Sequence, residues 1–329
     1  MQNVVILGST GSLGVQALEV LEKYKKHFRV IGLSANVNKT LLGKQAKKWK
    51  VKDSVLASES TPSALINLST LEKADIIINV LSGIAGINPS LSALKAGKIL
   101  LLGNKESLIA EGKKIMKLAA HSPAQLLPLD SEHNAIFEIL QKFPQKKIEK
   151  IILSCSGGPF YKKTKAQLKS ITVADALAHP RWDMGPKISI ESATLINKGL
   201  ELIEAHFLFN FPLSKISAIY HPKSQIHGAV KFKGEKFLTA YVSNPDMREH
   251  IENALLRAAK LQSLPKTFKK ISESSLSKIS TKTLAGIPLV LNFFKKNPTK
   301  MRAFLQHEEK VIQKFLAGKI NFSEIFTSL

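Results

Sequence analysis

Three side chains of different chemistry lie within five positions near the middle of the chain. Asn197 and Lys198 precede Glu201 by four and three residues, so all three project from one face if this stretch is helical. Just before them, Ile188 and Ile190 alternate with polar residues, which predicts a strand end feeding this helix. An amide, a cation and a carboxylate on one face can bind an anion and a metal ion. Taken alone, the spacing favours a simpler interpretation, an ion pair on a solvated helix.

A second acidic group follows a predicted strand at 125–129. Asp130 and Glu132 are two residues apart at its carboxyl end, where open α/β sheets bind their ligands. Carboxylates are the ligands that hard divalent cations prefer, but two of them rarely suffice for Mg²⁺ or Mn²⁺. Glu201 is the predicted third ligand. The alternative is Ser131 as a helix N-cap, with the acids stabilising the positive helix end.

A glycine-rich turn follows the first predicted strand, at 4–7. Gly8, Gly11 and Gly14 have the spacing G-x-x-G-x-x-G and lead into a helical pattern. In dinucleotide-binding folds, such glycines let the backbone approach a pyrophosphate at a helix N-terminus. The second strand is followed by no acid that would bind a ribose 2′-hydroxyl, whereas Lys39 can neutralise a 2′-phosphate, which favours NADPH. A tight turn without a ligand is the alternative.

Three further turns carry polar groups. Lys105 follows a predicted strand at 98–102 and is placed to reach an anion or a developing oxyanion. The Ser- and Gly-rich turn at 154–160 offers backbone amides for an anion, and its Cys155 is interpreted as a small packed residue. The loop at 179–185 carries a histidine, a tryptophan and a methionine, which predicts a lid that excludes water.

The order of the predicted elements divides the chain. Alternating strands and helices in the first half predict a doubly wound parallel sheet. Alternating residues at 220–242 predict antiparallel strands, and a helical pattern begins at 249. The Pro- and Ser-rich stretch at 263–280 is interpreted as a linker. The predicted domains are 1–125 for NADPH, 126–248 for catalysis, 249–280 as a connecting helix and linker, and 281–329 as a helical domain.

Composition narrows the class of protein. Of 329 residues, 44% are hydrophobic, and the net charge is +23. The lysines are scattered without interleaved aromatic residues or a nucleic-acid-binding motif, so small polyanionic ligands explain the charge better than nucleic acid does. One cysteine excludes an intramolecular disulfide. No signal peptide is recognised and no apolar run approaches the ~18 residues of a membrane span, so a cytoplasmic protein without membrane contact is expected.

Six motifs together carry a family resemblance. They are Gly8-Ser-Thr-Gly-Ser-Leu-Gly14, Gly103-Asn-Lys-Glu-Ser107, Asp130-Ser-Glu-His-Asn-Ala-Ile-Phe137, Ser156-Gly-Gly-Pro-Phe160, His179-Pro-Arg-Trp-Asp-Met-Gly185 and Ser192-Ala-Thr-Leu-Ile-Asn-Lys-Gly-Leu-Glu201. The chain strongly resembles the 1-deoxy-D-xylulose 5-phosphate reductoisomerase family. That resemblance implies rearrangement and NADPH-dependent reduction of this phosphosugar to 2-C-methyl-D-erythritol 4-phosphate, with Mg²⁺ or Mn²⁺. It also implies a Rossmann-like N-terminal α/β sheet, a central α/β catalytic domain, a small C-terminal helical domain and a homodimer.

The resemblance also implies roles for individual residues. The implied metal ligands are Asp130, Glu132 and Glu201. The implied catalytic residues are Lys105, Ser131, Glu132, His179 and His227. The implied substrate contacts, which include the phosphate site and the lid, are Ser131, Ser156, His179, Trp182, Met184, Ser192, Asn197, Lys198 and Glu201. The implied NADPH contacts are Gly8, Thr10, Gly11, Ser12, Leu13, Asn36, Asn38, Asn104, Lys105, Glu106 and Gly185.

The chain departs from the family pattern in three places. The turn after the second strand is Asn36-Val37-Asn38-Lys39, which displaces the lysine expected at the 2′-phosphate. The region 51–71 is compressed, and Gln306-His307-Glu308-Glu309 replaces an Asn-Ala-Ala-Asn-Glu-type run. Two alternatives remain open, a metal-free NADPH-dependent semialdehyde or sugar dehydrogenase and a lysine-rich nucleic-acid-binding or regulatory protein.

Overall fold

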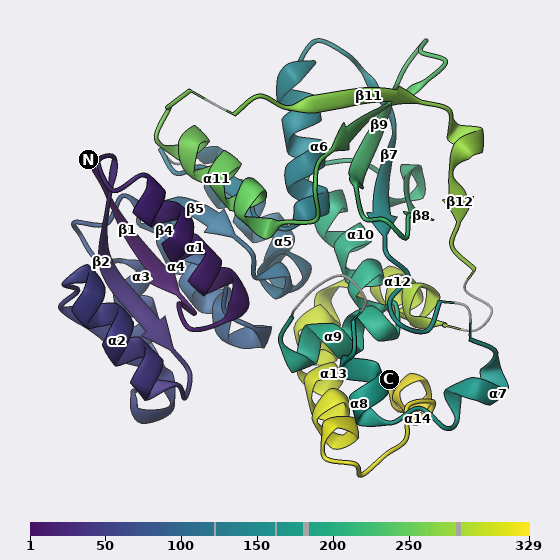
Figure 1. The fold of residues 1–329 in the computed structure, drawn as a ribbon, viewed down its shortest axis with the longest axis horizontal. Helices are drawn as coiled ribbons and strands as arrows, with labels where there is room; N and C mark the ends of the chain where they lie inside the picture. Colours follow the sequence, from purple (N-terminus) through teal and green to yellow (C-terminus); the bar gives the residue numbers. More distant parts are fainter. Residues whose placement is uncertain (122, 162, 180–183, 263, 281–283) are drawn as a thin grey trace. The chain divides into compact units, whose positions relative to one another are not determined.

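A computed structural model describes residues 1–121, 123–161, 163–179, 184–262, 264–280 and 284–329 (Figure 1). The contacts divide the chain into two compact units. Unit 1 contains Met1–Asn134 and Asp246–Pro265, and unit 2 contains Ala135–Pro245 and Lys266–Leu329. Among the described residues, no helix has the length and apolar character needed to cross a membrane.

Unit 1 is built on a parallel sheet of six strands. They are β1 (Gln2–Leu7), β2 (Phe28–Ala35), β3 (Asp53–Leu56), β4 (Ile76–Asn79), β5 (Ile99–Leu102) and β6 (Leu126–Pro128). Their order, β3-β2-β1-β4-β5-β6, is that of dinucleotide-binding folds and confirms the predicted doubly wound sheet. The central strands β1 and β4 are apolar and buried because helices cover both faces of such a sheet.

The helices of unit 1 include one that returns from late in the sequence. They are α1 (Ser12–Lys23), α2 (Lys39–Trp49), α3 (Ser63–Ser69), α4 (Ile87–Lys95), α5 (Lys105–His121) and α11 (Met247–Ala258), while α6 (Ser131–Lys142) continues into unit 2. The side chain of Asp246 caps α11 by accepting a hydrogen bond from the backbone of Arg248 at 2.9 Å. Glu252 then accepts hydrogen bonds from Lys23 and Tyr24, which fastens α11 to α1.

Unit 2 is built on a mixed sheet. Its strands are β7 (Ile148–Cys155), β8 (Ile216–Tyr220), β9 (Ile226–Phe232), β10 (Leu238–Val242), β11 (Thr267–Ile271) and β12 (Ser277–Lys278), in the order β11-β10-β9-β7-β8-β12. The β7–β8 pair is parallel, and the other pairs are antiparallel, as predicted for 220–242. Buried apolar side chains from four of these strands form one core cluster: Ile152, Ile219, Ala229, Leu238 and Ala240.

The interpretation of 263–280 as a linker was wrong for most of its described part. β11 extends the sheet beside β10, and β12 extends it beside β8. Both strands lie at sheet edges, and their residues are exposed or half-buried. An edge strand needs few apolar residues, so the lysines and serines of this stretch hid its pairing.

The helices of unit 2 are α7 (Lys165–Leu168), α8 (Val173–Leu177), α9 (Pro186–Ala193), α10 (Ile196–Leu208), α12 (Gly286–Lys296), α13 (Met301–Leu316) and α14 (Glu324–Ser328). Short 3₁₀ turns in the two units are η1 (Ala57–Glu59), η2 (Gly83–Gly86), η3 (Leu213–Lys215), η4 (Glu273–Ser275) and η5 (Pro298–Lys300). The helical patterns predicted after 249 are therefore confirmed, as is the start of a helix before Asn197.

The strand predicted around Ile188 and Ile190 is instead the helix α9. Pro186 occupies the first helical turn, where its fixed φ suits a helix and its missing N–H costs nothing. α9 and α10 are separated at Leu195, which has a left-handed φ of 61°. We call residues 192–198, which join the two helices, the elbow. The two isoleucines alternate by chance, and Ile190 is fully buried on the helix.

We predict that Ile152→Ala destabilises the protein by about 2–5 kcal/mol, because it removes a buried side chain from the centre of the core of unit 2. Urea unfolding followed by circular dichroism measures this change. The control is Val37→Ala, where the side chain is 70% exposed and the change should stay within about 0.5 kcal/mol. Equal effects of the two substitutions would contradict this assignment of the core.

Candidate active site

The glycine turn of unit 1 brings backbone close to backbone. Gly8 has a φ of 93°, and a Cβ on Gly14 would lie 2.2 Å from the carbonyl oxygen of Gly8. Gly11 is the N-cap of α1 and has no side chain with which to cap it. No side chain caps the start of α1, and in other nucleotide-binding turns an anion occupies this position. Thr10 lies in this turn, and Ser12 and Leu13 open α1.

Buried hydrogen bonds hold the turn in place. The hydroxyl of Ser9 donates to Gln45 Oε1 at 2.7 Å, and Gln45 Nε2 donates back to the carbonyl of Ser9 at 2.9 Å. The backbone amides of Gly8 and Ser9 donate to the carbonyl of Ser34 at 3.2 and 2.8 Å. Sequence reasoning missed Gln45, and the signal would have been a glutamine among the lysines of α2.

The turn after β2 contains the residues proposed for the 2′-phosphate end of NADPH. Asn36 is exposed, whereas Asn38 caps α2, its Oδ1 accepting from the amide of Leu41 at 3.1 Å. Lys39 Nζ lies 2.9 Å from Glu59 Oε2 in an exposed ion pair. Such pairs contribute little stability, so Lys39 can exchange its partner.

Asn104 and Glu106 shape the loop after β4. The side-chain nitrogen Nδ2 of Asn104 donates to the carbonyl of Gly83 at 2.8 Å and to Glu106 Oε2 at 2.9 Å. Glu106 Oε1 accepts from the amide of Gly83 at 2.9 Å. Both side chains are buried in this network, which fixes the backbone at the carboxyl end of the sheet.

The two predicted metal ligands of unit 1, Asp130 and Glu132, lie at the start of α6. Lys105 Nζ is 2.9 Å from Asp130 Oδ2, and the hydroxyl of Ser131 donates to Glu132 Oε2 at 2.5 Å. Burial raises the pKa of Asp130, but the Lys105 ammonium, with His133 and Glu132, outweighs it and holds that pKa well below its usual value. Asp130 is therefore ionised, as a metal ligand must be.

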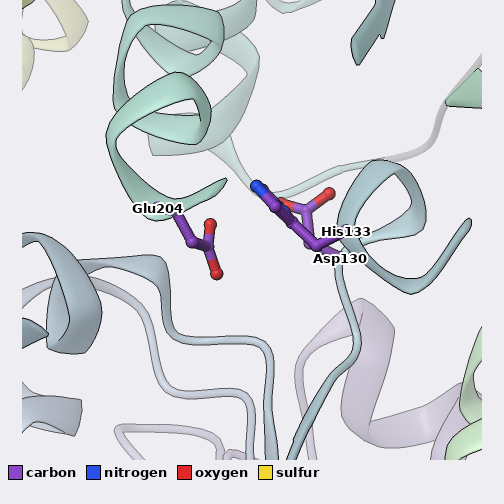
Figure 2. Close-up of side chains that lie close together, drawn as sticks. All are labelled: Asp130, His133 and Glu204. Atoms are coloured by element: carbon purple, nitrogen blue, oxygen red, sulfur yellow. The ribbon is translucent and has the colours of Figure 1, made fainter. Parts of the chain in front are cut away.

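Sequence reasoning assigned no role to His133, although it lies three residues after Asp130. Its Nδ1 is 4.0 Å from Asp130 Oδ2, and its side chain is fully buried. Figure 2 shows Asp130 and His133 at the start of α6, and the third side chain drawn there, Glu204, belongs to α10 of unit 2. The i,i+3 spacing on a helix start was the available signal.

In unit 2, the turn after β7 meets His179, the first residue of the predicted lid. The Oγ of Ser156 and Nε2 of His179 are 3.2 Å apart, and the amide of Gly158 donates to Ser156 Oγ at 3.3 Å. Burial lowers the pKa of His179 to about 4, so its imidazole is neutral at neutral pH. Gly157 and Gly158 both have positive φ, and Cys155 is buried, as expected for a packed residue.

The elbow brings more of the predicted phosphate site to this turn. A Cβ on Gly158 would lie 2.9 Å from the carbonyl oxygen of Ser192, so the turn packs directly against the end of α9. At the start of α10, Asn197 Nδ2 donates to Glu201 Oε1, and Lys198 Nζ pairs with Glu201 Oε2. Lys198 and Glu201 are 3% and 2% exposed, so the face predicted to be solvated is buried.

The remaining predicted residues of unit 2 occupy separate positions. His227 is buried on β9, with its ring 6.5 Å from that of Tyr241, and its carbonyl accepts from Ser154 Oγ at 3.0 Å. Gly185 is the N-cap of α9, and Met184 directly precedes it. Trp182, the aromatic residue of the predicted lid, lies outside the described residues.

Family models and curated relatives both point to one family. Residues 4–112 match the family model described as 1-deoxy-D-xylulose 5-phosphate reductoisomerase, and residues 126–209 match the model of its C-terminal domain. The reductoisomerase of Halothermothrix orenii is 38% identical, with 98% of this chain and 89% of the relative covered. That of Aquifex aeolicus is 35% identical, with 97% and 87% covered.

Solved structures agree. The 1-deoxy-D-xylulose 5-phosphate reductoisomerase from Zymomonas mobilis in complex with NADPH has a TM-score of 0.83 and 30% identity, covering 99% of this chain and 89% of that one. A reductoisomerase in complex with NADPH, fosmidomycin and magnesium has a TM-score of 0.83 and 29% identity, covering 99% and 88%. With both family models matched and relatives similar along their length, this chain belongs to the 1-deoxy-D-xylulose 5-phosphate reductoisomerase family.

Proposed function

We propose that this protein converts 1-deoxy-D-xylulose 5-phosphate into 2-C-methyl-D-erythritol 4-phosphate, using NADPH and a divalent metal ion. Membership of the family supports this activity. The observation that carries it is the group of Asn197, Lys198 and Glu201, which supplies an amide, an ammonium and a carboxylate within one turn of α10, the last two buried. The metal-free dehydrogenase alternative gains no support from the comparisons.

The glycine turn of unit 1 fits a dinucleotide. Only glycine fits at Gly8 and Gly14, and the amides at the start of α1 suit the pyrophosphate. NADPH supplies the hydride when bound. The proposed contacts are Gly8, Thr10, Gly11, Ser12, Leu13, Asn36, Asn38, Asn104, Lys105, Glu106 and Gly185. Because the side chains of Asn104 and Glu106 are buried in a hydrogen-bond network, we propose that the loops that they hold in place contact the NADPH.

Three carboxylates fit a hard divalent cation. We propose Asp130, Glu132 and Glu201 as ligands of Mg²⁺ or Mn²⁺, because Asp130 is ionised beside Lys105 and Glu201 pairs with Lys198. A divalent ion bound by these ligands acts as a Lewis acid toward the substrate oxygens. Lys198, which pairs with Glu201 in this structure, keeps its proposed role as a donor to the substrate phosphate.

The chain's own residues then bind and orient the substrate. We propose that Ser156, Ser192, Asn197 and Lys198 bind the phosphate, a non-reacting group whose binding energy orients the rest of the sugar. The neutral His179 beside Ser156 can donate one N–H to a phosphate oxygen. At the reacting end, the ammonium of Lys105 and the hydroxyl of Ser131 are the proposed donors to developing oxyanions, and Glu132 is a proposed catalytic group.

Further assignments follow from the family resemblance. We propose Trp182 and Met184 as parts of a lid and His227 as a catalytic residue. A homodimer and a cytoplasmic location are proposed on the same basis. So are an NADPH-binding segment at 1–125, a catalytic segment at 126–248 and a helical segment at 281–329. The small-molecule partner is the phosphosugar, with no role for nucleic acid or a membrane.

We predict that Glu201→Gln lowers turnover by at least about 100-fold, because the metal loses a charged ligand, while the Kd for NADPH changes less than about twofold. Turnover is measured by NADPH absorbance with substrate and Mg²⁺, and NADPH binding by fluorescence titration. Glu235→Gln, on a surface hairpin of unit 2, is the matched control with wild-type turnover expected. Wild-type turnover in Glu201→Gln, or wild-type activity that survives EDTA, would contradict the metal proposal.

We predict that Ser156→Ala raises the KM for 1-deoxy-D-xylulose 5-phosphate by about tenfold or more, because a hydrogen bond to a charged group contributes about 1.5–3 kcal/mol. The KM for NADPH should not change. Steady-state kinetics with each substrate varied separately measures both values. Ser170→Ala, at an exposed position of unit 2, is the control. An unchanged substrate KM in Ser156→Ala would remove Ser156 from the phosphate site.

We predict that His179 makes the free protein less stable at acidic pH. Its pKa is about 4 in the folded chain and 6.5 ordinarily, so between these values the unfolded chain binds a proton that the folded chain does not. The free energy of unfolding therefore falls as the pH falls from 6.5 towards about 4. Urea unfolding at several pH values should show a weaker pH dependence in His179→Asn than in the wild type. An identical dependence in both proteins would contradict the buried neutral imidazole.

A further inference from the structure

The N-terminus of α12 lies directly against the elbow. A Cβ on Gly286 would lie 2.3 Å from the carbonyl oxygen of Thr194, 2.4 Å from the amide nitrogen of Ile196 and 2.6 Å from the carbonyl carbon of Leu195. All three are backbone atoms and cannot turn aside as a side chain can. Position 286 therefore accepts glycine alone while the elbow keeps its conformation.

A second close approach lies one turn further along both helices. A Cβ on Gly199 of α10 would lie 2.9 Å from the Cβ of Val290 and 3.2 Å from the Cα of Ile287. α10 and α12 therefore pack with their backbones close together, immediately after Lys198. The start of α10 cannot move without moving α12.

α13 is connected to the other side of the elbow by a buried ion pair. Lys187 Nζ of α9 lies 3.4 Å from Glu308 Oε2 and also pairs with Glu191, one turn along α9. Glu308 is 0% exposed, and Glu191 is 2% exposed. Glu308 stands in the stretch where this chain departs from the family's usual run.

The elbow needs such support. Leu195 has a left-handed φ of 61°, a conformation that costs a non-glycine residue about 1 kcal/mol or more. It persists where surrounding contacts determine it, and Gly286 supplies those contacts. The elbow carries Ser192 on one side of Leu195, and Asn197 and Lys198 on the other. Its backbone conformation therefore sets the spacing of three proposed phosphate contacts.

We infer that α12 and α13 form a brace that fixes the elbow and thereby positions the phosphate-binding groups. Gly286 is a positioning residue through backbone contact, and Glu308 is a positioning residue through Lys187. Neither residue is among the proposed substrate contacts. This inference rests on the proposed function, and gives the divergent C-terminal helices a role in substrate affinity.

The first test is Gly286→Ala. The added methyl group must displace the elbow, so the KM for 1-deoxy-D-xylulose 5-phosphate should rise about tenfold or more, with kcat changed less than about threefold and the Kd for NADPH unchanged. Gly43→Ala is the matched control, because a Cβ at Gly43 of α2 meets no atom within 4 Å. A wild-type substrate KM in a folded Gly286→Ala variant would overturn the inference.

The second test is Glu308→Gln, which keeps the side-chain shape and leaves the Lys187–Glu191 pair in place. The substrate KM should rise at least about threefold while the melting temperature stays close to the wild type. Glu308→Asp, which keeps the charge, should recover part of the affinity, and Lys310→Gln, at an exposed position of the same helix, is the control. Glu308→Gln also tests the brace if Gly286→Ala fails to fold.

The results separate the two proposals. If the wild type fails to oxidise NADPH with 1-deoxy-D-xylulose 5-phosphate and Mg²⁺, the proposed function is wrong. If the wild type is active and both Gly286→Ala and Glu308→Gln keep its substrate KM, the function stands and the brace is wrong. A fall in melting temperature without a change in substrate KM would likewise show that these contacts serve stability alone.

Discussion

A buried carboxylate must be compensated by nearby charge, and Glu201 sets this constraint for unit 2. Lys198 and Asn197 meet it within the first turn of α10, where both carboxylate oxygens accept hydrogen bonds. Loss of one partner from such a buried pair is strongly destabilising, so the start of α10 has little freedom to vary. The same three groups suit the metal and the phosphate, and the stability of the helix and its chemistry thus depend on one arrangement.

Close backbone approach recurs wherever an anion is proposed to bind. In unit 1, Gly8 and Gly14 fold the turn before α1 tightly enough to present its amides. In unit 2, Gly158 places the Ser156 turn against Ser192, and Gly286 supports the elbow behind it. Without Cβ atoms, backbone dipoles can be packed densely and aimed at one point, which is how proteins bind phosphate without relying on long, mobile lysines.

Much of this organisation could be predicted from the sequence, because strands buried on both faces and glycines with fixed spacing have recognisable local sequence patterns. The parallel sheet and the start of α10 are examples. Three features could not be predicted from a local sequence pattern. The alternating isoleucines of α9 have the pattern of a strand, although Pro186 and the packing of α9 favour a helix. The lysine-rich β11 is recognisable only through its pairing with β10. The close packing of Gly199 against Val290 joins α10 to α12, which lies some ninety residues later in the sequence.

The return of α11 to unit 1 has a consequence for how the chain folds as it is synthesised. Unit 1 consists of two segments, Met1–Asn134 and Asp246–Pro265, and is therefore discontinuous in sequence. Its first 134 residues can form the parallel sheet early, but the side of α1 that α11 covers stays exposed until residues beyond 246 emerge. Contacts of such long sequence separation form slowly. A fragment ending after β6 would be an incomplete nucleotide-binding domain, with an uncovered α1 that favours association with other chains.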